Sequence, residues 1–161
     1  MLTRASTPMV RHPDLIERIA PFAAPDEMVV GAFRVFRGPR PGAEFLAIAL
    51  NVPVFAFAPV GALAAVVICL ISVVAITAII QTLRQYILCA VTNRGVLLIG
   101  CGHVPGRWSP KSLIASGPWA SMGTPKDHVE SRIRIGDRSY WLSGAEYDEA
   151  RRLNRWITDQ A

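Results

Sequence analysis

The pattern of hydrophobic residues divides the chain into three parts. Residues 45–83, between Glu44 and Arg84, contain no charged side chain and are almost entirely apolar. On both sides of this block, short apolar runs alternate with polar residues, as they do in water-exposed domains. We therefore expect a cytoplasmic N-terminal segment over residues 1–44, a membrane segment over 45–83 and a cytoplasmic domain over 84–161.

The apolar block is too long for one straight membrane helix. Its 39 residues would form a helix of about 58 Å, whereas the hydrocarbon core of a bilayer is about 30 Å thick. Pro59 and Gly61 divide the block into arms of about 15 and 22 residues, which predicts a helical hairpin. Because Asn51 and Pro53 interrupt the first arm, a re-entrant or interfacial first arm is the alternative.

Basic residues indicate on which side of the membrane the two ends lie. Arg37 and Arg40 precede the block and Arg84 and Arg94 follow it, while the turn at residues 59–61 carries no charge. Lys and Arg close to membrane segments stay on the cytoplasmic side. We therefore expect a multi-pass protein of the cell inner (plasma) membrane with both termini in the cytoplasm.

Short patterned runs predict the elements outside the membrane. In the N-terminal segment, an amphipathic helix opens at Pro13 and a strand covers residues 28–37. After the block, strands are expected at residues 86–92, 96–101, 113–115, 131–135 and 139–142. If both termini share one compartment, the strand at 28–37 can complete this sheet, whose edge would otherwise be open.

A final helix is expected to cover the sheet. Ser143 and Glu146 have the spacing of a capping box, in which each residue satisfies a backbone N–H at a helix start. The helix that follows presents an apolar stripe made of Ala150, Leu153, Trp156 and Ile157. Several short antiparallel strands and one amphipathic helix are typical of a small β-barrel or sandwich closed by a C-terminal helix.

Residues 86–101, with the sequence YILCAVTNRGVLLIGC, resemble a known family. They are similar to the aromatic-x-x-x-x-V-T-N-R-x-V-L-L segment of bacterial pleckstrin-homology-like (PH-like) domains, which commonly follow one or two membrane helices. The similarity covers roughly residues 84–158 and is most specific at Thr92-Asn93-Arg94. The chain departs from the pattern at Gly95, where a second Arg is usual, and in the Pro- and Gly-rich stretch 104–125. The resemblance implies a membrane α+β protein, with a two-helix transmembrane hairpin before a small antiparallel β domain and its C-terminal helix.

Side chains suited to catalysis are few and scattered. Cys101 and His103, with Cys89 across the predicted hairpin, come nearest to a metal or nucleophilic site. A closed zinc site takes four ligands, however, and His12 and His128 lie in unrelated contexts. We therefore expect no catalytic residue, no metal ion and no cofactor. A small membrane enzyme that uses Cys101 and His103 is the least favoured alternative.

The net charge of +5 raises the question of an anionic partner. The basic residues accompany no nucleic-acid-binding motif, so we expect no nucleic acid and favour anionic lipids. Trp prefers the head-group layer and cations prefer anionic lipids. The candidate head-group contacts are Arg84, Arg94, Arg107, Trp108 and Lys111.

These features predict a non-catalytic, membrane-anchored accessory or scaffold subunit that docks on a larger multi-subunit membrane complex. Small-residue pairs such as Gly61 and Ala65 allow close helix packing, either within the hairpin or against larger integral membrane subunits. A bacterial respiratory complex is one such host. The alternative is a PH-like module that binds anionic lipids, although a fold does not fix a function.

Overall fold

The computed structural model describes residues 13–40, 62–102, 108–125 and 131–160, with four single positions between residues 42 and 49. The chain forms two units. The first joins Met1–Arg37 to Gln85–Ala161, and we call it the sheet domain. The second unit is Gly38–Arg84.

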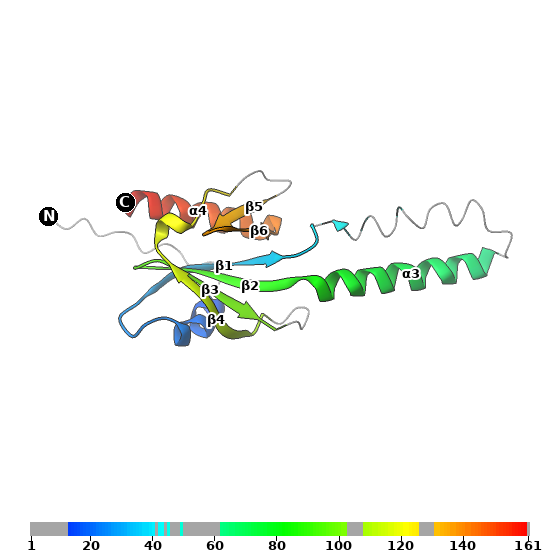
Figure 1. Ribbon diagram of the computed structural model, residues 1–161, viewed down its shortest axis with the longest axis horizontal. Helices are drawn as coiled ribbons and strands as arrows, with labels where there is room; N and C mark the ends of the chain where they lie inside the picture. The colour runs from blue at the N-terminus through cyan, green and yellow to red at the C-terminus, as the bar shows by residue number, and fades with distance from the viewer. Residues whose placement is uncertain are drawn as a thin grey trace. The chain divides into compact units, whose positions relative to one another are not determined.

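Six antiparallel strands form the sheet domain, in the order β4-β3-β2-β1-β6-β5 (Figure 1). They are β1 Val29–Arg37, β2 Gln85–Thr92, β3 Val96–Cys101, β4 Pro110–Gly117, β5 Arg132–Ile135 and β6 Arg138–Leu142. Each strand predicted from the sequence is present among the described residues. β4 is longer than expected, because the Pro- and Gly-rich stretch does not prevent its pairing with β3.

β1 lies inside the sheet, which confirms that the strand before the apolar block joins the strands after it. It pairs with β2 from Val29 opposite Thr92 to Arg37 opposite Gln85, and with β6 at Val35 and Phe36. Its valines and aromatic residues favour an extended chain. The first and last parts of the sequence therefore build one domain.

Helices cover both faces of this sheet (Figure 1). The helices are α1 Pro13–Ile19, η1 Ala20–Phe22, η2 Trp119–Ser121 and α4 Gly144–Gln160. α4 buries Leu153 and Ile157 in one apolar cluster, and α1 buries Leu15 and Ile19 in the other. Because both faces of the central strands are buried, β2 reads as a nearly continuous apolar run rather than an alternating one.

In the second unit, α3 covers Ala62–Leu83. Its window Val66–Leu83 has a mean hydropathy of 2.6, so it is long and apolar enough to cross a membrane. Its large apolar side chains are mostly exposed, with Leu63 at 80%. This helix matches the predicted second arm. The predicted first arm lies outside the described residues apart from isolated positions, so the described part of the chain holds one apolar helix where the sequence predicted two.

Candidate functional site

Thr92 is the centre of the motif that carries the family resemblance. Its side chain is fully buried, and its Oγ1 donates a hydrogen bond to Glu27 at 2.5 Å. The same oxygen accepts the N–H of Gly95 at 3.0 Å, while Trp119 Nε1 donates to the carbonyl of Thr92 at 2.8 Å. Thr92 thus joins three segments that are distant in sequence.

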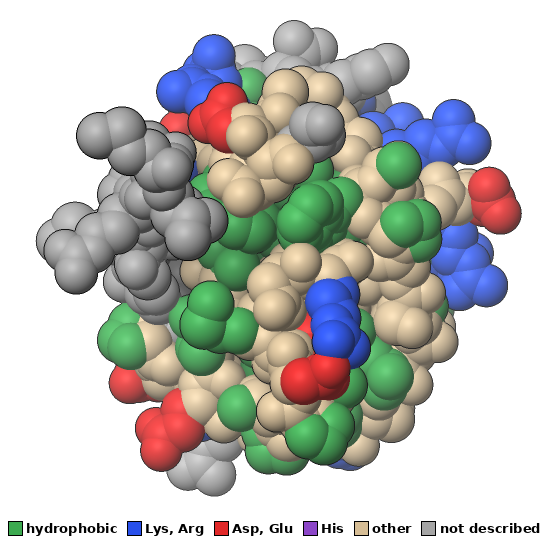
Figure 2. Space-filling view, turned by 90° about the vertical axis from the view of Figure 1, so that its left-hand side faces the viewer, with side chains coloured by type: hydrophobic (Ala, Val, Ile, Leu, Met, Phe, Trp, Pro, Cys, Tyr) green, Lys and Arg blue, Asp and Glu red, His purple; other side chains and the backbone are tan. Residues whose placement is uncertain are grey.

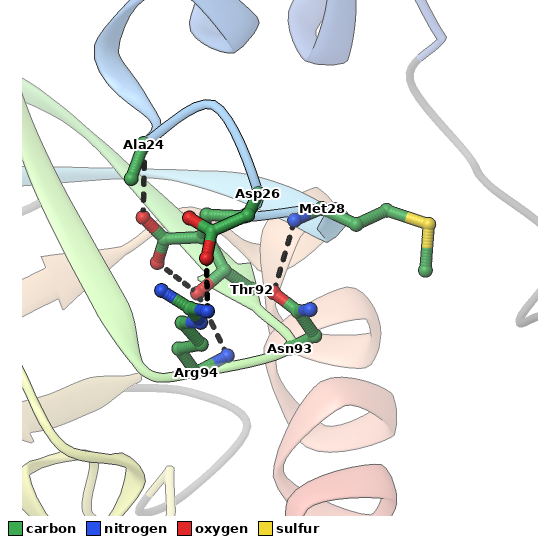
Figure 3. Close-up of polar contacts among 7 residues, drawn as sticks. Ala24, Asp26, Met28, Thr92, Asn93 and Arg94 are labelled. Atoms are coloured by element: carbon green, nitrogen blue, oxygen red, sulfur yellow. Dashed lines mark hydrogen bonds and ion pairs between the residues drawn. The ribbon is translucent and has the colours of Figure 1, made fainter.

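Asn93 and Arg94 extend this network (Figure 3). Asn93 Oδ1 accepts the N–H of Met28 at 2.9 Å, and the Asn93 N–H donates to the Met28 carbonyl at 3.0 Å. The Arg94 guanidinium forms an ion pair with Asp26. Thr92, Asn93 and Arg94, at the turn between β2 and β3, therefore bind the loop before β1 through hydrogen bonds and an ion pair. This structural role explains these three residue types.

This network weakens the case for Arg94 as a head-group contact. Arg94 comes two positions after Thr92, the last residue of β2. Gln85 begins β2 seven residues before Thr92, and at about 3.3 Å per residue the two ends of β2 are about 23 Å apart. Figure 2 looks at the end of the domain where β2 finishes, and it shows both acidic and basic side chains there. Arg94 thus contributes to a mixed surface rather than to a basic patch.

The other lipid-contact candidates occupy different places. Arg84 belongs to the second unit, where its side chain is mostly buried and its Nη2 donates to the Arg40 carbonyl at 3.2 Å. Arg107 lies outside the described residues. Trp108 and Lys111 lie at the Gln85 end of the sheet, just before and at the start of β4. The structure therefore brings together two of the five candidates.

Three further residues, which the sequence prediction missed, complete a cluster around Trp108. The rings of Tyr86 and Trp108 meet edge to face, with their centroids 4.9 Å apart. The Arg34 guanidinium carbon lies 5.4 Å from the centroid of the Trp108 ring, a cation–π distance. Phe36 flanks Tyr86 at 6.5 Å. Arg34 and Phe36 are two positions apart in a predicted strand and therefore lie on the same face of it. This spacing is the sequence signal that could have pointed to these two residues.

A groove with a mixed apolar and polar lining lies beside the edge strand β4. Its volume is about 290 Å³, and it lies between β4 and the turn from β5 to β6, with Val96, Leu98 and Tyr140 in its lining. Leu113 and Ile114 on β4 are each 46% exposed. Two irregularities interrupt the pairing of β4 with β3, and bulges of this kind hinder an added strand. The groove therefore offers side-chain contacts rather than a clean strand edge.

Burial makes Cys89 and Cys101 poor nucleophiles. Burial in the core raises the pKa of Cys89 far above its ordinary value. Burial also raises the pKa of Cys101 to about 11, although a backbone hydrogen bond with Leu88 and the charge of Arg34 oppose that rise. His103 lies outside the described residues, and in the described part of the chain no three His, Cys, Asp or Glu side chains group as metal ligands would.

No protein-family model, curated protein or solved structure matches this chain. The resemblance of residues 86–101 to bacterial PH-like domains therefore stays a prediction. The geometry of the sheet domain and the composition of α3 are the basis for a functional proposal.

Proposed function

We propose that this protein is a non-catalytic accessory subunit, anchored in a bacterial inner membrane by a helical hairpin and docked on larger integral membrane subunits. The observation that carries the proposal is the pairing of β1 with β2, the two strands that flank the apolar segment. The exposed apolar surface of α3 and the groove beside β4 support it independently.

The pairing of β1 with β2 constrains how the chain can cross a membrane. Arg37 ends β1 and pairs with Gln85, which begins β2, so residues 38–84 leave and re-enter the sheet domain at the same place. A segment that leaves and returns on one side of a bilayer crosses it an even number of times. If α3 makes one crossing, the residues between Arg37 and α3 must make the second crossing. Together with the basic flanks, this supports a hairpin with both termini in the cytoplasm.

α3 has the chemistry of an anchor. It contains no ionisable carboxylate, imidazole, amine or guanidinium side chain, and its apolar residues follow no single face. A helix that is apolar all round is stable inside lipid or among other helices. The same composition supplies none of the charged groups that proton or ion pathways use, which favours anchoring and packing over transport.

The groove beside β4 supports docking on a protein. It combines apolar residues in its lining with Asp137 and Arg138 at the turn between β5 and β6. Protein interfaces have this composition, with an apolar centre inside a polar rim. We assign the groove to contact with the cytoplasmic face of a larger subunit.

Purification of the tagged full-length chain from its native membranes in mild detergent tests the proposal. Integral membrane proteins should co-purify, and Ile114→Asp should lower their recovery at least about tenfold, because it puts a charge into the groove. Met28→Asp is the matched control, since Met28 is 64% exposed, precedes β1 and is separated from β4 by β3 and β2. Recovery of a monodisperse protein without a partner, or equal recovery from both variants, would contradict docking through this groove.

A further inference from the structure

The end of the sheet domain where β2 begins carries a patch of aromatic and basic side chains. We call it the β2-start patch, and it consists of Arg34, Arg37, Tyr86, Trp108 and Lys111. Tyr86 and Trp108 are partly exposed, and the side chain of Lys111 lies over Gly102 at the end of β3. Arg37 pairs with Gln85 through the backbone, which brings a third strand to the same end. Strands β1 and β2 and the start of β4 therefore bring rings and cations to the same end of the sheet, with Arg37 on the face opposite to Tyr86.

Chain length fixes how far this patch can lie from a membrane that α3 crosses. Leu83 is the last residue of α3, and Tyr86 follows it by three positions. Three extended residues span at most about 11 Å. The head-group layer adds about 5 to 8 Å to each side of the hydrocarbon core. Tyr86, and with it the ring of Trp108, therefore lies in or beside the head groups.

The charge of the patch is positive overall. Arg34 lies 3.6 Å from the carboxylate of Glu146, so its charge is shared with a buried acid. Arg37 and Lys111 are exposed and add two further positive charges. Lys and Arg near an anionic membrane surface are attracted to it, and Tyr and Trp rings prefer the interfacial layer.

We propose that the β2-start patch contacts the head-group layer of an anionic bilayer, with Tyr86 and Trp108 in the interface and Arg37 and Lys111 on lipid phosphates. The inference rests on the proposed function, because it requires α3 to cross the membrane. It differs from the sequence prediction in its residues: Tyr86, Arg34 and Arg37 enter the contact, and Arg94 leaves it because it lies at the other end of β2.

Fluorescence quenching by brominated lipids tests whether Trp108 lies in the head-group layer. The full-length protein is reconstituted into phosphatidylglycerol-containing vesicles, and tryptophan quenching is compared between variants. Trp108→Phe should remove most of the lipid-quenchable fluorescence. Trp156→Phe is the control, because Trp156 packs edge to face on Trp119, at 5.6 Å between centroids, and should leave quenching unchanged. Unchanged quenching in Trp108→Phe would overturn the contact.

A double variant tests the proposed contact of Arg37 and Lys111 with lipid phosphates. Arg37→Gln with Lys111→Gln should reduce the quenching of Trp108 in phosphatidylglycerol vesicles and leave it unchanged in pure phosphatidylcholine. Arg151→Gln with Arg155→Gln removes the same charge from exposed positions on α4 and should have no effect. Equal effects of the two double variants, or of the two lipids, would overturn the role of these cations.

Extraction of the same vesicles with alkaline carbonate separates this inference from the proposed function. Release of the protein by carbonate would refute membrane anchoring itself. A carbonate-resistant protein whose Trp108 is not quenched would leave the anchor intact and refute the head-group contact alone.

Discussion

Single residues in the turn after β2 hold the sheet domain together. Thr92 bridges Glu27 and Gly95 from a fully buried position. Gly95 permits the close approach of β3 and the end of β4, since a Cβ at this position would lie 2.2 Å from the carbonyl oxygen of Gly117. A side chain at position 95 would therefore have to displace the backbone at the end of β4.

Removal of the Thr92 hydroxyl should destabilise the sheet domain. Thr92→Val keeps the shape of the side chain but leaves the buried N–H of Gly95 and a Glu27 oxygen without this partner. We expect a loss of about 1 to 3 kcal/mol in the free energy of unfolding, measured by denaturant titration in detergent. Thr158→Val is the control, because the Thr158 hydroxyl is exposed and bonds within its own helix. Equal stability of the two variants would refute the role given to Thr92.

The reactivity of Cys101 should show its raised pKa. With a pKa of about 11, this thiol stays protonated at neutral pH. The thiolate is the reactive form, so alkylation should speed up about tenfold for each pH unit from pH 7 to pH 10. Site-resolved mass spectrometry should show this continued rise at Cys101, while a free thiol in the same tube levels off above its pKa near 8.5. A plateau at Cys101 near pH 8.5, or faster alkylation of Cys89, would contradict the burial described.

At the scale of elements, the position of each strand in the sheet decides what it can do. β1 has neighbours on both sides, whereas β4 is an edge strand with exposed apolar side chains. α4 and α1 cover opposite faces of the central strands. Binding surfaces therefore remain at the β4 edge and at the ends of the strands.

Amide hydrogen exchange should separate these strands. The amides of residues 31–37 in β1 should be about as protected as those of β2, because both strands lie inside the sheet. Residues of β4 should exchange at least about tenfold faster, since one side of that strand has no partner strand among the described residues. Exchange of β1 as fast as that of β4 would show that β1 is not an inner strand in solution.

The sequence predicts well where strands and helices lie along the chain, but it predicts less well which residues of different strands come into contact. Apolar runs and turn residues locate β2, β3 and α4 because those signals are local. The same signals cannot show that Trp108 packs on Tyr86, 22 positions earlier, because that contact depends on register across three strands. They also treat Arg94 and Lys111 as equivalent charges, although the length of β2 separates them.

For the whole molecule, the proposal of a membrane anchor turns on how many times the chain crosses the bilayer. The strands that flank residues 38–84 are neighbours, so an odd number of crossings would separate partners that the sheet joins. Once α3 is taken as a span, this pairing requires an even number of crossings, and the basic flanks favour the cytoplasm as the side that both termini share. The number of crossings is open to a direct experiment.

Labelling with a membrane-impermeant maleimide should find the turn and the sheet domain on opposite sides. In intact cells, Val60→Cys at the expected outer turn should be labelled, whereas Arg151→Cys, exposed on α4, should react only after the membrane is opened. Labelling of both introduced cysteines in intact cells, or of neither, would refute the hairpin with cytoplasmic termini.

The place of β1 in the sheet also sets an order of events during synthesis. The ribosome finishes β1 and then makes the 47 residues of Gly38–Arg84 before β2 begins to emerge. At about 5 to 20 residues per second, β1 waits about 2 to 10 seconds for its first partner strand. The sheet can therefore be completed only after the apolar segment has left the ribosome, and any delay in making that segment prolongs the time for which β1 lacks its first partner strand.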